Sequence, residues 1–107
     1  MSYVIRRVFT VKPGSARRVA TNLEKQAKEY ENAGQRSPTR IYFNGGTLPG
    51  EVNRVYMEWT ADVIDSPYRE GNVIPQSARD AGAGNQGLIE GNYIEFYELL
   101  TPAKYQE

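Results

Sequence analysis

The sequence contains neither cysteine nor histidine. The chain therefore has no thiolate nucleophile and no disulfide. It also has no cysteine or histidine that could bind zinc or haem iron. Ser-His-Asp and Cys-His catalysis are excluded for the same reason. The acidic residues Asp62, Asp65 and Glu70 do not have the spacing of a calcium-binding loop. We accordingly predict neither a metal nor a cofactor.

Long apolar runs are also missing. No stretch approaches the roughly 20 apolar residues that cross a bilayer. Arg6 and Arg7 interrupt the short apolar run near the N-terminus, which is unlike a signal peptide. We therefore expect a cytoplasmic protein without a membrane partner. The 13 basic and 13 acidic residues balance, and glutamates interleave with the basic residues of the first predicted helix, so we expect no nucleic-acid partner.

The chain has 107 residues, which is the size of one domain. Its apolar content of 39% is sufficient for a folded core, and its charges are too balanced for a disordered chain. We expect residues 1–107 to form a single domain.

Apolar periodicity predicts a strand, a helix and a hairpin in the first part of the chain. Residues 3–11 alternate and are rich in β-branched and aromatic types, as in a strand. Apolar residues then recur at helical spacing from a cap at Ser15 to a stop at Gly34. Residues 40–44 and 54–60 have the composition of strands, and the turn-rich loop between them is typical of an antiparallel hairpin.

The remaining sequence predicts a second helix and a last strand. The segment 62–90 has a helix start at Ser66, which is followed by a proline. Its internal glycines weaken it, so packing must hold this helix together. Gly91 is expected to end it, and residues 93–100 are expected to form the final strand.

This order of elements predicts an α+β fold of the ferredoxin-like βαββαβ type. Right-handed crossovers place the strands in the spatial order 4-1-3-2, with antiparallel neighbours and both helices on one face. The other face should be polar, yet both alternating sets of side chains include large apolar groups. A second subunit is needed to cover so apolar a surface, so we predict a homodimer that forms through the sheet face.

The predicted strand order also explains an uneven distribution of charge. Residues 1–40 carry nine basic and three acidic groups, whereas residues 41–107 carry four basic and ten acidic groups. The first strand, with two arginines, lies between strands that carry Glu58 and Glu95. Opposite charges therefore pair across neighbouring strands, and no polyanionic partner is required.

Residues 7–14, Arg-Val-Phe-Thr-Val-Lys-Pro-Gly, end the first predicted strand ahead of a long amphipathic helix. This stretch resembles the opening of the NIPSNAP-like group within the dimeric α/β-barrel superfamily, which also contains proteins like the antibiotic-biosynthesis monooxygenases. The resemblance implies that two ferredoxin-like sheets pair into a barrel. Members include cofactor-free monooxygenases, haem-degrading enzymes, muconolactone-isomerase-like enzymes and proteins without known activity. This chain lacks the histidine that serves as haem ligand in the haem-degrading members.

Charged residues within the apolar strands form the first candidate site. Arg7 is the strongest candidate, with Glu95 as a carboxylate near it. In a barrel interior, such groups orient an anionic or phenolic ligand, or shift a carboxyl pKa for acid-base catalysis. The alternative interpretation is a cross-strand ion pair that fixes the register of the strands.

Aromatic residues on the strands form the second candidate site, a pocket for a flat aromatic molecule. Aromatic stripes on strands also form cores and interfaces, which is the alternative interpretation. Asn44, at the end of a strand, is a candidate donor to a bound oxygen, although the glycines after it are typical of a hairpin turn. The aromatic candidates are Trp59, Tyr42, Tyr56, Tyr93 and Tyr97.

These features predict a protein that binds a small aromatic or anionic organic ligand in the cavity of a dimeric barrel. Two alternatives stay open. The first is a monooxygenase or isomerase without metal or haem, which would use Arg7, strand tyrosines and a carboxylate such as Glu95. The second is a structural or interaction module without a pocket.

Overall fold

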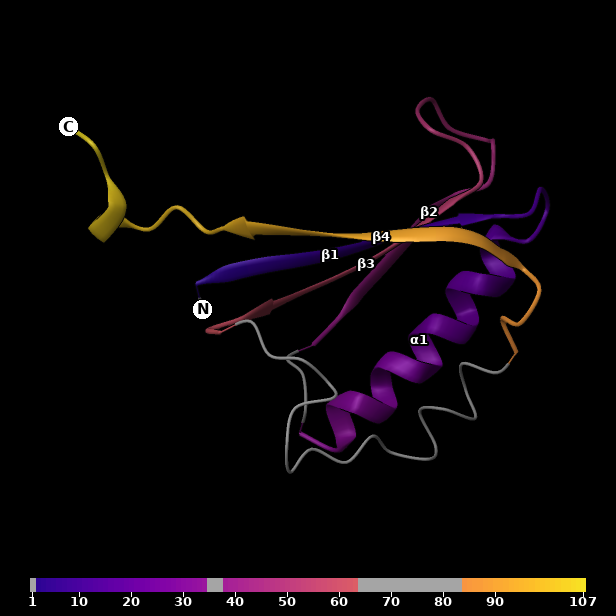
Figure 1. Cartoon of the computed structure of the whole chain (residues 1–107), viewed down its shortest axis with the longest axis horizontal. Coiled ribbons are helices and arrows are strands. Elements are labelled where there is room, and N and C mark those ends of the chain that lie inside the picture. Colours follow the sequence, from indigo (N-terminus) through magenta and orange to yellow (C-terminus); the bar gives the residue numbers. More distant parts are fainter. Residues whose placement is uncertain (1, 35–37, 64–83) are drawn as a thin grey trace.

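The computed structural model describes residues 2–34, 38–63 and 84–107. The second predicted helix falls mostly outside these ranges. The described elements, which Figure 1 shows, are β1 (Tyr3–Val11), α1 (Ala16–Asn32), β2 (Arg40–Asn44), β3 (Arg54–Ala61), β4 (Ile89–Glu98) and the 3-10 helix η1 (Pro102–Lys104).

The predicted bounds of the first elements are confirmed. β1 and β2 have the predicted ends, and β3 continues one residue further, to Ala61. Helix α1 begins directly after Ser15 and has Ala33 as its C-terminal cap. Gly34 follows with a φ of +73°, the left-handed conformation that ends many helices and costs glycine little.

Strand β4 differs from its prediction because it begins at Ile89, so that Gly91 lies inside the strand. Gly87, with a φ of +81°, lies in the turn before the strand. The register of β4 against β1 shifts once, since Thr10 faces Gly91 whereas Val11 faces Ile89. This shift is a β-bulge, in which one extra residue of β4 is accommodated.

The four strands form one antiparallel sheet in the order β2-β3-β1-β4. This is the predicted order 4-1-3-2, counted from the other edge, and the prediction is therefore confirmed. Helix α1 lies across one face of the sheet (Figure 1). Within the described residues, no helix covers the opposite face.

The core lies between α1 and the sheet, and it fixes which side of each strand faces the helix. Because side chains alternate along a strand, the residues between the core positions point away from α1. We call that side of the sheet the open face. The core consists of Phe9, Val11, Val55 and Met57 from the sheet, with Ala16, Val19, Ala20, Leu23 and Ala27 from α1. The open face includes Arg6, Val8, Arg40, Tyr42, Tyr56, Glu58, Tyr93, Glu95 and Tyr97.

Candidate functional site

A row of four charged residues crosses the open face, with one residue on each strand. From β2 to β4 the row contains Arg40, Glu58, Arg6 and Glu95, and each residue lies opposite the next. The charge alternates in sign at every step, which favours pairing across the strands. The cross-strand pairing that the sequence predicted for the first strand is thus confirmed, with Arg6 as the arginine involved. We call this set the charged row.

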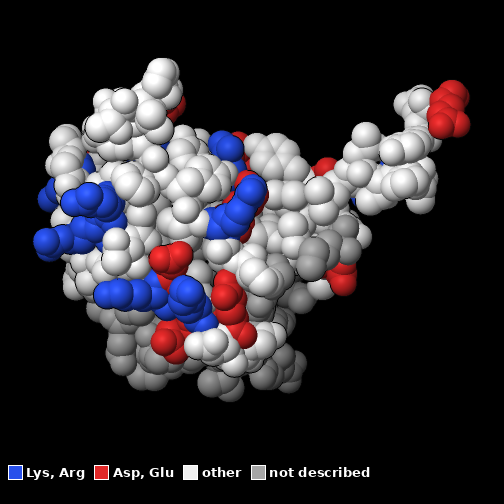
Figure 2. Space-filling view, turned by 180° about the vertical axis from the view of Figure 1, so that it is seen from behind, with Lys and Arg blue, Asp and Glu red and all other residues white. Residues whose placement is uncertain are grey.

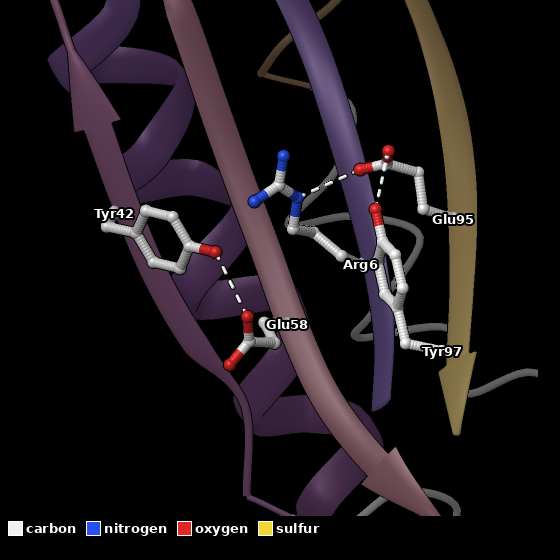
Figure 3. Close-up of polar contacts among 5 residues, drawn as sticks. All are labelled: Arg6, Tyr42, Glu58, Glu95 and Tyr97. Carbon is white, nitrogen blue, oxygen red and sulfur yellow. Dashed lines mark hydrogen bonds and ion pairs between the residues drawn. The ribbon is translucent and has the colours of Figure 1, made fainter. Parts of the chain in front are cut away.

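At the β1–β4 side of the charged row, Glu95 accepts two hydrogen bonds. Arg6 Nε donates to Oε1 at 2.9 Å, and the Tyr97 hydroxyl donates to Oε2 at 2.7 Å (Figure 3). The hydrogen bond to Glu95 raises the pKa of Tyr97, because a phenolate there would face a carboxylate. Both oxygens of this carboxylate are therefore engaged by neighbouring side chains.

The β2–β3 side repeats the arrangement around Glu58. Arg40 Nη2 donates to Oε2 at 2.5 Å, and the Tyr42 hydroxyl donates to Oε1 at 3.1 Å. The hydrogen bond from Arg40 holds the pKa of Glu58 below its usual value. Burial raises the pKa of Tyr42, and the hydrogen bond to Glu58 raises it further. Both glutamates thus pair with one arginine and one phenol.

A second row, one pleat further along the strands, is mostly aromatic. We call it the aromatic row, and from β2 to β4 it contains Tyr42, Tyr56, Val8 and Tyr93. The rings of Tyr42 and Tyr56 stack with centroids 5.0 Å apart and an angle of 14° between their planes. Val8 lies between Tyr56 and Tyr93 and is only 1% exposed, so the accessible part of this row is aromatic.

Two tyrosine rings of β4, one in the aromatic row and one on the other side of the charged row, remain accessible in the described structure. Tyr93 is 54% exposed and Tyr97 is 47% exposed. The guanidinium of Arg6 lies over the ring of Tyr56, with Cζ 4.9 Å from the centroid. This is the geometry of a cation–π contact, which links the charged row to the aromatic row.

The structure divides the predicted site residues between the two faces. Arg7 lies opposite Met57 on the side of the sheet that faces α1, where its Nε is buried without a hydrogen-bond partner among the described residues. Trp59 packs against the core on that same side. The expectation that these two residues share one surface with Glu95 and Tyr97 is wrong, because side chains alternate along β1 and β3 and the core fixes the opposite phase.

Asn44 lies at the end of β2 and shapes the loop that follows. Its Nδ2 donates to the carbonyl of Leu48 at 2.9 Å, and its Oδ1 accepts from the backbone N–H of Gly46 at 2.9 Å. Gly46 has a φ of +123°, which glycine adopts readily, and this agrees with the turn predicted for the glycines after Asn44. A ligand-binding role for Asn44 stays a prediction.

Arg6 is the residue that the sequence-based site assignment missed. The neighbouring sets of β1 differ in one respect that indicated it. Ile5, Phe9 and Val11 form a larger apolar set than Val4 and Val8. The larger set is the one expected to pack against the helix. Arg7 is a member of that set, so Arg6 points to the opposite face.

The open face can therefore stack planar rings and donate hydrogen bonds. Its two glutamates are poorly placed to act as bases, because both oxygens of each carboxylate already accept hydrogen bonds from an arginine and a tyrosine. Within the described ranges, no group of three or more acidic side chains could hold a metal ion. In the same part of the chain, no helix has the length and hydropathy to span a bilayer.

A separate hollow of about 410 Å³ lies beside the first turns of α1. None of the predicted site residues is among the residues that line it. Basic side chains gather at the end of the molecule away from the C-terminus, whereas acidic and basic groups interleave elsewhere on the face seen in Figure 2. The hollow is lined by Gly14, Arg17, Arg18, Thr21 and Asn22.

Neither a protein-family model nor a curated protein matches the sequence. Solved structures are similar in fold at low sequence identity. The protein PA3566 from Pseudomonas aeruginosa has a TM-score of 0.62 and 15% identity over 94% of this chain and 95% of that one. A dimeric protein of unknown function and ferredoxin-like fold from Bacteroides fragilis has a TM-score of 0.58 and 16% identity, covering 91% of this chain and 96% of its own.

An uncharacterised NIPSNAP domain protein from Burkholderia xenovorans is also similar, with a TM-score of 0.52 and 16% identity. The match covers 98% of this chain and 99% of that protein. The resemblance to ferredoxin-like and NIPSNAP-like proteins that the sequence indicated is thus confirmed at the level of fold. Together with the strand order, these likenesses show that the chain has the ferredoxin-like fold.

Proposed function

We propose that the chain forms a homodimer through its open face and that the dimer binds a small aromatic molecule between the two sheets. The observation that carries this proposal is the aromatic row together with the exposed rings of two tyrosines on β4. Tyr93 and Tyr97 expose about half of their surface in the single chain. Large apolar surfaces of this kind on one subunit mark interaction or ligand sites.

The charged row supports burial of this face between two copies. Its two arginines and two glutamates cancel, so the pairing of two faces buries no net charge. A structural neighbour from Bacteroides fragilis is described as dimeric, which supports the same assembly for this fold. The cytoplasmic location expected from the sequence stays a prediction.

Binding is a better explanation of this surface than acid-base catalysis. A monooxygenase or isomerase of the predicted kind needs a carboxylate that is free to take a proton. Both oxygens of Glu95 already accept hydrogen bonds, and so do both oxygens of Glu58. The surface instead offers ring faces and an arginine, which are groups that hold and orient a planar molecule.

The dimer is tested by light scattering coupled to size-exclusion chromatography at micromolar concentration. We expect the wild-type chain to have the mass of two subunits and Tyr93→Glu to shift it toward one subunit, because a charge would be buried without a partner. Leu48→Glu, at an exposed apolar position in the β2–β3 loop, is the matched control and should remain dimeric. A monomeric wild-type protein would contradict the proposal.

Ligand binding is tested by calorimetric titration with phenol, benzoate and benzoquinone. We expect at least one of these aromatic probes to bind to the dimer. Tyr93→Ala and Tyr97→Ala should each weaken binding, since a lost stacking contact contributes about 0.5 to 1.5 kcal/mol. If no aromatic probe binds to a well-formed dimer, the face is an interface only, and the interaction module is the correct interpretation.

A further inference from the structure

We infer that the aromatic molecule on the open face carries a carboxylate and that the terminal nitrogens of Arg6 bind it. This inference rests on the proposed function, and it adds the chemical class of the ligand and the residue that recognises it. The contacts of Arg6 carry the argument, because they leave one edge of its guanidinium available.

A guanidinium presents two edges to a carboxylate: one that includes Nε and one formed by the two terminal nitrogens. In Arg6 the first edge is used, since Nε donates to Glu95 Oε1 at 2.9 Å. One face of the group lies over the ring of Tyr56. Figure 3 shows the terminal nitrogens between the Tyr42–Glu58 pair and the Glu95–Tyr97 pair. The Tyr42 hydroxyl interacts with Arg6 from one side, and no carboxylate among the described residues is bound to the terminal nitrogens.

This arrangement fixes the guanidinium before any ligand arrives. The ion pair with Glu95 and the contact with Tyr56 hold its plane, and Tyr97 in turn holds the other oxygen of Glu95. The Arg6 side chain is nevertheless 34% exposed, so its terminal edge is accessible. A guanidinium that is already fixed in place loses little conformational entropy when a ligand binds. Its paired N–H groups favour a planar anion with two oxygens over a single acceptor atom.

The hydrogen-bonding balance of the open face points to the same ligand chemistry. All four carboxylate oxygens of the charged row accept hydrogen bonds from Arg6, Arg40, Tyr42 or Tyr97. Donors remain at the terminal edge of Arg6, at the centre of the sheet beside the aromatic row, and on the more exposed Arg40 at the edge strand. A ligand at the centre of the sheet must therefore bring acceptor atoms to Arg6, and a carboxylate does so with a charge that complements the arginine.

The surroundings of Arg6 select an aromatic body for this acid. Val8 beside it is buried, and the accessible rings of Tyr93 and Tyr97 lie on the adjacent strand. A flat ring can stack on these faces while its carboxylate reaches the arginine. Because Glu95 and Glu58 lie on either side of Arg6 in the charged row, a second negative charge on the ligand is disfavoured.

The experiment is calorimetric titration of the native protein with benzoate, benzamide and phthalate. We expect benzoate to bind about tenfold to a hundredfold more tightly than benzamide, its neutral analogue, and more tightly than the doubly charged phthalate. Arg6→Gln should abolish the preference for benzoate over benzamide, and Arg6→Lys should restore only part of it, because lysine keeps the charge and loses the fork.

Arg17→Gln makes the same charge change in the hollow beside α1 and is the matched control, so it should leave the preference intact. Circular dichroism and light scattering establish that each variant is folded and has the mass of the wild type. If benzamide binds as tightly as benzoate, or if Arg6→Gln and Arg6→Lys both keep the preference, the carboxylate inference is wrong while the proposed function stands. If Arg17→Gln removes the preference, the anion binds in the hollow and the inference is also wrong. A monomer, or a dimer that binds no aromatic probe, contradicts the proposed function itself.

Discussion

Arg6 of β1 lies directly opposite Glu95 of β4, and its Nε donates a hydrogen bond to Oε1 at 2.9 Å. This pair joins the central strand to an edge strand on the face that α1 leaves uncovered. It also orients the arginine toward the ring of Tyr56. The contribution of this ion pair to the stability of the fold can be measured separately from any role of Arg6 in ligand binding.

A double-mutant cycle with Arg6→Ala and Glu95→Ala measures the strength of this pair. Both side chains are about one-third exposed, at 34% and 29%, so water screens the interaction. We expect a coupling free energy of about 0.5 to 1 kcal/mol, which decreases as salt is added. Urea denaturation at one fixed protein concentration provides the measurement, and a coupling of zero at low salt would show that the pair does not stabilise the fold.

Glu58 predicts a loss of stability at acidic pH. The hydrogen bond from Arg40 lowers the pKa of Glu58 below its ordinary value of 4.5 in the folded chain. The unfolded chain therefore takes up this proton first as the pH falls. The contribution of Glu58 is present above pH 4.5 and is lost as the pH falls through the lower, folded pKa.

The check is the free energy of unfolding as a function of pH for the wild type and for Glu58→Gln. The variant should show a shallower decrease below pH 4.5, since glutamine does not titrate. Glu24→Gln, on the outer surface of α1, is the charge-matched control. An unchanged slope in Glu58→Gln would refute the assignment.

Tyr42 and Tyr97 predict late ionisation at alkaline pH. Burial raises the pKa of Tyr42 above 10.0, and the hydrogen bond to Glu95 raises the pKa of Tyr97. Since the folded pKa is the higher one, the stability from these groups is complete below pH 10 and is lost as the pH rises through their folded pKa values. Near-ultraviolet absorbance of tyrosinate follows the titration. Tyr42→Phe and Tyr97→Phe should each remove a late component, whereas Tyr105→Phe is the chemical control.

Two glycines should respond in opposite ways to alanine. Gly14 has a φ of +81° between β1 and α1, so Gly14→Ala should destabilise the fold by about 1 to 2 kcal/mol. Gly91 lies within β4, and an added Cβ there would meet no atom of the described structure within 4 Å. Gly91→Ala should be neutral or stabilising by about 0.4 to 1 kcal/mol, because it restricts the unfolded chain. Chemical denaturation of the two variants beside the wild type decides both expectations.

Local patterns in the sequence were sufficient for most of the fold. Alternation over residues 3–11 and helical spacing after Ser15 gave the correct elements, because each pattern extends over many residues. The start of β4 could not be predicted in this way. Gly87 and Gly91 are both plausible turn residues, and only the pairing of β4 with β1 places the turn at Gly87 and keeps Gly91 inside the strand, next to the bulge.

The candidate site was predicted in composition but not in orientation. The sequence determined by itself that the strands carry aromatic and paired charged residues, and the handedness of crossovers determined which strands are neighbours. The larger apolar set of β1 favoured Arg6 for the open face, but the sequence alone did not make this choice, because both alternating sets are apolar enough to form a core face. That choice was made by the packing of α1 against Phe9 and Val11, since burial of one set obliges the next side chain along the strand to point the other way.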